Sequence, residues 1–246
     1  MLPPVENICV PSASVPVCCG DEGPASGAGF VHPTSLDVLP DGTVAIFDSG
    51  VASNGRFAMV RAVTPDGNFH RVAGRGTAGE SGDGGPALAA RISAGSSIAG
   101  GTDGSILLVE ADTNRVRRVT PNGRIETVAG TGARGSGGDG GSALAAQLHG
   151  PASISPAADG GYFVAAGGDG HVRRVAPDGA ISTVGTVSSR WNIGKSLLRL
   201  TGLANGGVAV SDGRTPRVRA VDGSDRMVAI SQQAHPHARL DRHRKF

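Results

Sequence analysis

Two glycine-rich segments hold carboxylates that could bind a metal ion. They read Gly82-Asp83-Gly84-Gly85-Pro86-Ala87 and Gly138-Asp139-Gly140-Gly141-Ser142-Ala143. Carboxylate and carbonyl oxygens are ligands for Ca²⁺, but one aspartate per segment supplies too few of them. The sequence also has no Asp-x-Asp-x-Asp run. We therefore expect both segments to be structural, with Asp capping the backbone, Gly allowing positive φ, and Ala87 to Ala90 forming a short helical turn.

The cysteines and histidines form no recognisable catalytic motif. Cys9, Cys18 and Cys19 are an odd set near the start of the sequence, and no histidine follows at zinc-finger spacing. One disulfide and three reduced thiols are both compatible with this pattern. There is no Gly-x-Ser-x-Gly nucleophile elbow, and no Gly-Lys-Ser/Thr follows either glycine-rich segment. We therefore expect no catalytic residues, no cofactor and no bound metal.

The composition argues against two classes of partner. The formal net charge is +2, and the 246 residues include 6 Phe, 1 Trp and 1 Tyr. Near-neutral charge and few aromatic side chains are unfavourable for nucleic-acid binding. No apolar run is long enough to span a membrane, and residues 1–20 lack the basic and apolar regions of a secretory signal. We therefore expect neither nucleic acid nor a membrane as partner, and the compartment stays open.

An internal repeat positions all the residues above. The octapeptide Val116-Arg117-Arg118-Val119-Thr120-Pro121-Asn122-Gly123 has counterparts that start at Val60 and Val172, so the three starts are 56 residues apart. A weaker copy begins at Val218. Repeats of this length indicate a solenoid, a propeller or an array.

The pattern of the second repeat predicts four short strands. We predict them at 97–101, 105–109, 115–119 and 124–129, with tight turns at Asp103-Gly104 and Pro121-Asn122-Gly123. The apolar run at 105–109 is typical of a strand buried on both faces. Four antiparallel strands per repeat predict the blades of a β-propeller.

The repeats resemble those of the NHL-repeat propellers, in particular a bacterial glycine-rich subtype, over about residues 30–231. The resemblance rests on the octapeptide, on Ile125-Glu126-Thr127-Val128-Ala129-Gly130-Thr131-Gly132, and on the two glycine-rich linkers. The Asn-His-Leu centre of that family is absent, and only Ala111 to Val116 keeps part of it. Family members commonly close with about six blades, whereas four copies are recognisable here.

The predicted fold class is therefore all-β, a propeller of about four four-stranded antiparallel blades. Either the ring closes with four or five blades, or it stays open and its edge strands favour self-association. The predicted domains are a leader at 1–29 that is poorly structured or lends a closing strand, a propeller at 30–231, and a basic disordered tail at 232–246. The blades are expected at about 30–92, 93–148, 149–200 and 201–231.

Chain connectivity predicts which face of the propeller binds. The first-to-second and third-to-fourth turns share one face and are short. The linkers and the second-to-third loops share the other, which we call the long-loop face, and loops on a rigid scaffold are usual binding sites. We predict a non-catalytic scaffold that binds a protein or peptide here. The candidate contacts are Arg75, Asp83, Asp112, Asn114, Arg115, Arg134, Asp139, Trp191 and Asp212.

The alternative is a lactonase- or lyase-like metalloenzyme, because some propellers hold a central divalent metal. Its ligands would come from Glu110, Asp48, Asp112, Asp212, His32 and His149, provided that three or more of them point at one axial position. A third hypothesis is that the chain is a degraded or truncated repeat protein without a present role.

Arginines recur on the third strands, at positions 61, 117, 118, 173, 174, 217 and 219. They could form a basic stripe for an acidic partner, or they could shield exposed strand edges and pair with nearby carboxylates. The near-neutral charge favours the second interpretation.

Overall fold

The structure is a computed structural model that describes residues 22–52, 55–93, 97–186, 199–203, 207–211, 218–221 and 227–230. Throughout these residues the protein is all-β, as the sequence predicts, apart from three single 3-10 turns: η1 (Ala25–Gly27), η2 (Ala87–Ala89) and η3 (Ala143–Ala145). The turn η2 is the short helical turn expected in the first glycine-rich linker. No helix in the described ranges is long and apolar enough to cross a membrane.

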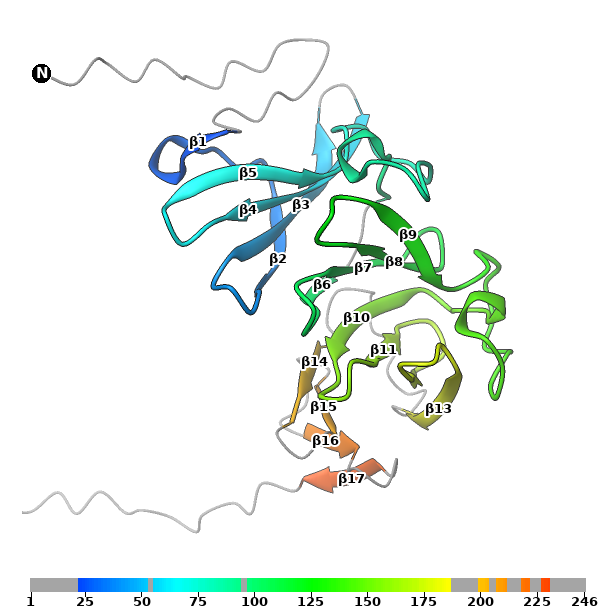
Figure 1. The fold of residues 1–246 in the computed structure, drawn as a ribbon. Helices are drawn as coiled ribbons and strands as arrows, with labels where there is room; N and C mark the ends of the chain where they lie inside the picture. Colours follow the sequence, from blue (N-terminus) through cyan, green and yellow to red (C-terminus); the bar gives the residue numbers. More distant parts are fainter. Residues whose placement is uncertain are drawn as a thin grey trace, which may run out of the picture.

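Four antiparallel sheets follow one another around an arc, and each sheet is one propeller blade (Figure 1). Successive strands pair within each blade, and the short strand β1 adds to the outer edge of blade 1 beside β5. The inner strands β2, β6, β10 and β14 lie next to one another in that order.

The strands have the following bounds. Blade 1 contains β1 (Gly23–Pro24), β2 (Pro33–Val38), β3 (Val44–Ala52), β4 (Gly55–Val63) and β5 (Asn68–Ala73). Blade 2 contains β6 (Ser97–Gly100), β7 (Ile106–Glu110), β8 (Arg115–Val119) and β9 (Ile125–Ala129). Blade 3 contains β10 (Pro151–Pro156), β11 (Tyr162–Ala166), β12 (His171–Val175) and β13 (Ile181–Thr186). Blade 4 contains β14 (Arg199–Gly202), β15 (Val208–Ser211), β16 (Val218–Val221) and β17 (Met227–Ile230).

The Pro-Asp-Gly and Pro-Asn-Gly turns close one end of blades 1, 2 and 3, as predicted. In blade 2 the amide of Gly123 donates to the carbonyl of Thr120, and Gly123 has a φ of 76°. Gly67 and Gly179 repeat this geometry, with φ of 81° and 84°. A positive φ is accessible to glycine without steric cost, which is why the turn sequence ends in Gly. The hairpin between the second and third strands is longer in blade 1 than in blades 2 and 3, because β3 and β4 continue to pair as far as Ala52 and Gly55.

The hydrophobic core lies between blades. Ile98 and Leu108 of blade 2 pack against Phe47 and Val60 of blade 1 in one buried cluster. We call the face of a blade that packs on the preceding blade its leading face, and the opposite face its trailing face. Alternate residues of each second strand point to the two faces, so β7 is buried at every position. Similar clusters fill the junctions between blades 2 and 3 and between blades 3 and 4.

A buried arginine ties each blade to the linker before it. Arg117 of β8 is 2 % exposed and pairs with Asp83 at 2.6 Å, and it also donates to the carbonyl of Arg91 at 2.9 Å. The second carboxylate oxygen of Asp83 accepts a hydrogen bond from the backbone of Thr127 in β9. The linker aspartate thus joins the linker to two strands of the following blade. The guanidinium of Arg117 is buried, and a buried charge is stable only when it is paired and hydrogen-bonded.

The same bridge repeats one blade later. Arg173 is 1 % exposed, pairs with Asp139 and donates to the carbonyl of Gln147 at 2.8 Å, while Thr183 donates to Asp139 at 3.0 Å. The pKa of Asp139 is lowered, because burial acts to raise it but the hydrogen bonds from Thr183 and Arg173 outweigh that effect. The expectation that the third-strand arginines shield exposed edges is therefore wrong for Arg117 and Arg173, which lie in the interior.

Blade 1 carries the same arrangement. Arg61 is fully buried and donates to the carbonyl of Gly29 at 2.6 Å, and its guanidinium lies over the rings of Phe30 and Phe69. The segment Gly20-Asp21-Glu22-Gly23-Pro24-Ala25 repeats the linker pattern of residues 82–87. Its described part binds β5 as the later linkers bind their blades, with the amide of Ala25 donating to the carbonyl of Gly67. Residues 22–28 thus pack as a linker in front of blade 1.

We expect Arg117→Met to lower the free energy of unfolding by about 3 kcal/mol or more, because it leaves the carboxylate of Glu110 buried without its cation. Urea denaturation measures this value. Arg118→Met is the matched control on the same strand. Arg118 is 40 % exposed and pairs with Glu126, so its loss should cost about 1 kcal/mol at most. Equal losses for the two variants would contradict the structural role of the bridge.

Candidate binding face

The long-loop face carries exposed arginines on successive linkers. Arg75 and Arg134 are exposed, and within the described ranges neither forms an ion pair. Their backbones are fixed, since the amide of Arg75 donates to the carbonyl of Ala90 and Arg134 forms a bridge with Leu148. The face therefore presents two guanidinium groups from a rigid backbone.

Two ion pairs flank these arginines. Arg56 pairs with Asp112 at 2.7 Å, and Arg115 pairs with Glu80 at 2.8 Å. Arg115 also donates to the carbonyl of Thr131 at 3.1 Å. Exposed pairs of this kind are worth about 1 kcal/mol or less, so a ligand can exchange partners with them at low cost.

Three of the predicted contact residues serve the fold. Asp83 and Asp139 hold the buried arginines. Asn114 has a φ of 52°, donates to the carbonyl of Gly132 at 3.2 Å and accepts from the amide of Gly150 at 2.9 Å. These contacts occupy the polar groups that a Ca²⁺ site would need. Trp191 and Asp212 lie outside the described residues.

The carboxylates proposed for a catalytic metal are also committed to internal bonds. Asp48 is buried, accepts from the amides of Val31 and His32, and lies 3.4 Å from Arg61. His32 itself contacts the carbonyl of Ser49 through Nδ1 at 3.2 Å. Across the described ranges no group of three His, Cys, Asp or Glu is placed to hold a metal ion.

Glu110 occupies the equivalent position in blade 2. It accepts from the amide of Ser93 at 3.0 Å and from the hydroxyl of Thr113 at 3.1 Å, and it lies 3.6 Å from Arg117. Burial raises the pKa of Glu110, although Arg117 and the hydrogen bonds act in the opposite direction. In blade 3 the register places Ala166 here, so the carboxylate is not part of every repeat.

A polar cluster lies on the second-to-third loop of blade 3. Asp169 is 3.6 Å from Nδ1 of His171 and 3.9 Å from Nδ1 of His149. All three side chains are partly exposed. His149 and Asp112 therefore belong to different local pairs, and the structure does not bring the described members of the predicted metal set to one axial position.

The inner strands line a central cavity of about 760 Å³. Serines face the neighbouring blades here: Ser35 accepts from the amide of Ile98 at 3.2 Å, and Ser153 accepts from the amide of Leu200 at 3.0 Å. Asp37 similarly accepts from the amide of Gly100 at 2.8 Å. These polar side chains bind inner strands to one another, and among the described residues that line the cavity only Asp37 and Arg199 are charged.

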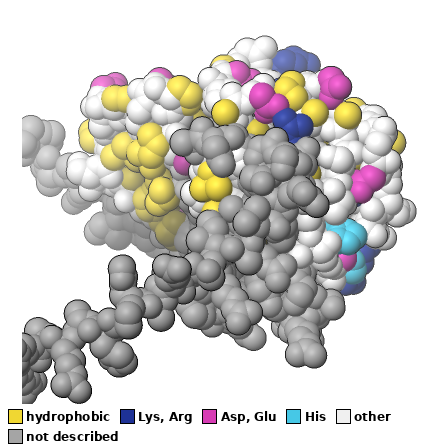
Figure 2. Space-filling view, turned by 90° about the horizontal axis from the view of Figure 1, so that it is seen from below, with side chains coloured by type: hydrophobic (Ala, Val, Ile, Leu, Met, Phe, Trp, Pro, Cys, Tyr) yellow, Lys and Arg dark blue, Asp and Glu magenta, His cyan; other side chains and the backbone are white. Residues whose placement is uncertain are grey.

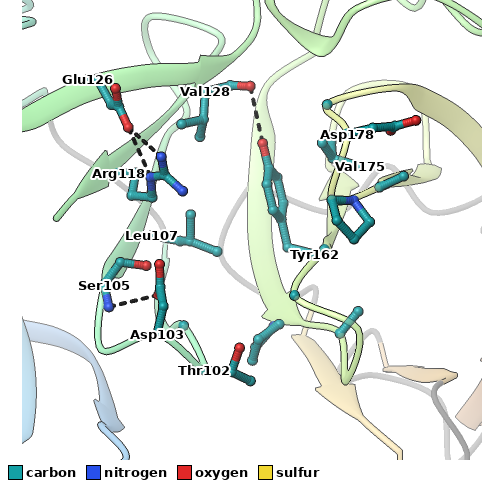
Figure 3. A pocket seen from close by; sticks show the side chains of 18 of the residues that line it. Thr102, Asp103, Ser105, Leu107, Arg118, Glu126, Val128, Tyr162, Val175 and Asp178 are labelled. Carbon is teal, nitrogen blue, oxygen red and sulfur yellow. Dashed lines mark hydrogen bonds and ion pairs between the residues drawn. The ribbon is translucent and has the colours of Figure 1, made fainter.

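A groove on the face that carries the tight turns, which we call the tight-turn face, was not anticipated from the sequence. It has a volume of about 470 Å³ and lies between blades 2 and 3 (Figure 3). Tyr162 forms part of its wall and donates to the carbonyl of Val128 at 3.3 Å, and Arg118 pairs with Glu126 at the rim. Burial raises the pKa of Tyr162, so its hydroxyl stays protonated. The available signal was the single Tyr of the chain, at the position that Ile106 fills in blade 2.

Comparison with known proteins supports the propeller fold. Neither a protein-family model nor a curated protein matches the chain. Among solved structures, a streptogramin B lyase is 14 % identical with a TM-score of 0.52, over 80 % of this chain and 53 % of that one. An auxiliary nutrient-binding protein from Bacteroides thetaiotaomicron is 10 % identical with a TM-score of 0.56, over 85 % of this chain and 43 % of that one. A candidate gluconolactonase is 16 % identical with a TM-score of 0.52, over 85 % of this chain and 66 % of that one.

These similarities establish the β-propeller fold and nothing finer, because the identities are low and enzymes and binding proteins both occur among the neighbours. The chain spans about half the length of the streptogramin B lyase. The resemblance to NHL repeats stays a prediction.

The buried carboxyl of Glu110 predicts an unusual pH dependence. Because the pKa of this carboxyl is higher in the folded than in the unfolded chain, the folded state binds its proton more tightly. The resulting stabilisation is complete below the unfolded-state pKa of about 4.3 and is lost as the pH rises. The stability of the wild type relative to Glu110→Gln should therefore fall as the pH rises above about 4.3 in urea titrations.

Asp103 provides the opposite control, because its pKa is lowered chiefly by the side-chain hydrogen bond from Ser105. The stabilisation of the wild type relative to Asp103→Asn should be fully present above about pH 4 and should decrease at lower pH. The same slope for both variants would contradict the assignment.

Proposed function

We propose that the protein is a non-catalytic scaffold that binds an acidic segment of a protein or peptide on its long-loop face. The observation that carries this proposal is the pair Arg75 and Arg134, two exposed cations without an ion-pair partner in the described ranges, on linkers whose backbones are fixed. Arginine binds carboxylates through a planar fork of donors, which gives geometric selectivity as well as attraction.

The local charge balance supports the same partner. Around the first two linkers the exposed or half-buried cations outnumber the anions. The cations are Arg56, Arg75, Arg91, Arg115 and Arg134, and the anions outside the buried bridges are Glu80 and Asp112. This part of the surface is positive although the whole chain is near neutrality. Such a field steers acidic ligands to the face and makes their binding sensitive to salt.

The carboxylates that could bind a catalytic metal are hydrogen-bonded or ion-paired within the fold, which supports a non-catalytic role. Asp48, Glu110, Asp83 and Asp139 each satisfy backbone amides or buried arginines. A metalloenzyme would need such groups to converge on an open position. The lyase and the candidate gluconolactonase among the neighbours make catalysis a necessary control. Purified protein should leave gluconolactone and a streptogramin B antibiotic unchanged with or without Mg²⁺, and turnover of either would overturn the proposal.

Selection from a peptide display library tests the ligand class. We expect the selected peptides to be enriched in Asp and Glu, and their affinity for the double variant Arg75→Glu/Arg134→Glu to fall at least about tenfold, since two attractive charges become repulsive. Isothermal titration measures the affinity. The wild-type affinity should also fall with rising salt.

The double variant Arg118→Glu/Arg174→Glu is the control of equal charge change. Arg118 borders the tight-turn groove, and Arg174 pairs with Asp159. Binding should survive in this control. Loss in the control with retention in Arg75→Glu/Arg134→Glu would place the ligand in the tight-turn groove and refute the long-loop face.

A further inference from the structure

The leading face of blade 1 is built as a blade junction but is exposed. Leu36 pairs with Ile46, as Ile98 pairs with Leu108 and Ile154 with Val164, so the three residues hold one position in the repeat. Ile98 and Ile154 are 4 % and 3 % exposed, whereas Leu36 is 65 % exposed. Ile98 and Ile154 are buried because blades 2 and 3 each pack on a preceding blade, whereas no blade in the described ranges covers Leu36.

The rest of this face shows the same difference. Val44, Ile46 and Val63 are half-buried, while their counterparts Ile106, Leu108 and Val119 are buried. Val38, at the end of β2, is 56 % exposed. Figure 2 shows apolar side chains gathered on the left of the view, the side on which blade 1 lies in Figure 1. A contiguous apolar surface on a soluble chain marks an interaction site.

The linker in front of blade 1 is equally incomplete. Phe30 takes the linker position of Ile92 and Leu148, which are 0 % and 1 % exposed between their blades, but Phe30 is 39 % exposed. The linker alanines at 25 and 28 are half-buried, whereas their counterparts Ala87 and Ala90 are fully buried. In blade 1 the linker and the sheet therefore both expose a surface whose counterparts in blades 2 and 3 are covered by the preceding blade.

We infer that this surface binds the trailing face of blade 4 from a second copy of the chain. At all three internal junctions a leading face meets a trailing face, so the complement of the open surface is a trailing face. Blade 4 presents one: Val208 and Val210 are buried against blade 3, while Ala209 and Ser211 alternate to the other side and are half-buried.

Blade 4 of the same chain does not cover this surface. Leu36 is exposed, and in the described ranges blades 1 and 4 lack the close strand contacts that neighbouring blades make. Two copies joined head to tail would form two identical junctions about a two-fold axis. Their eight blades lie within the range in which propellers close. The ring is independent of the acidic ligand proposed for the long-loop face.

Sedimentation equilibrium of the full chain over a concentration series tests this inference. We expect a monomer–dimer equilibrium that ends at twice the mass of one chain. Leu36→Asp should raise the dimer dissociation constant at least about tenfold, because it places a charge in both junctions. Leu144→Asp is the matched control, since Leu144 is 56 % exposed on a linker away from this face, and it should leave the constant unchanged.

A second variant tests the head-to-tail geometry. Ala209→Glu should weaken the dimer like Leu36→Asp, and an equimolar mixture of the two variants should associate more tightly than either alone, because the mixed dimer keeps one intact junction. Circular dichroism melting of each variant shows that the fold is retained.

Three results would overturn the inference. They are a monomer at every concentration, a dimer that Leu36→Asp does not weaken, and a dimer that resists Ala209→Glu, which would mean that two blade 1 faces pack together. A chain lacking residues 1–21 identifies the competing occupant. If only that shortened chain dimerises, the leader covers the face of the full chain.

Discussion

The architecture depends on burying an arginine side chain in each of the first three blades and satisfying its charge. In blades 2 and 3 the carboxylate comes from the linker, 34 residues earlier, and its second oxygen accepts from the fourth strand of the same blade. An unpaired guanidinium in this place would cost several kcal/mol, so linker and blade must adopt their positions together. The bridge therefore fixes how far each blade lies from the preceding linker. The same atoms cannot then serve as a calcium site.

The apolar core imposes a complementary constraint. The clusters at the first two junctions each contain residues from two consecutive blades and the linker between them, so the main core of a blade is shared with its neighbour. The stability of such a protein is approximately a sum over junctions, as in other repeat proteins. A blade whose leading face meets no other blade has one incomplete junction. The exposed position of Leu36 is the direct consequence, since the same side chain position is buried wherever a preceding blade is present.

Much of the fold was predictable because it follows from local chemistry. The Pro-Asp-Gly turns and the short strands of each repeat, such as 115–119, are encoded within a few residues and recur with the 56-residue period, and the structure confirms them. The role of Arg117 was not predictable from its strand, because its partner Asp83 belongs to another segment and is brought near only by the packing of two blades. The linker at residues 20–25 had a readable signal, the Gly-Asp-x-Gly-Pro-Ala pattern.

The candidate site was predictable as a face but not residue by residue. Connectivity alone places the long linkers together, yet it does not say which side chains the fold consumes. A comparison among the copies does. The bridge residues Asp83 and Asp139 recur because the linkers before blades 2 and 3 both pair with a buried arginine, whereas Arg75 aligns with Thr131 and Arg134 aligns with Ala78.

In the first pair the linker backbone makes the same hydrogen bond, since the amides of Arg75 and Thr131 donate to the carbonyls of Ala90 and Ala146. Next to the second pair, the amides of Gly79 and Gly135 likewise donate to the carbonyls of Ile92 and Leu148. The fold thus tolerates either side chain at these positions. Function resides in sites that a fold carries, so the residues free to differ between copies are where recognition can be encoded. On the long-loop face those residues are arginines, and their charge is the feature that the repeat architecture itself does not require.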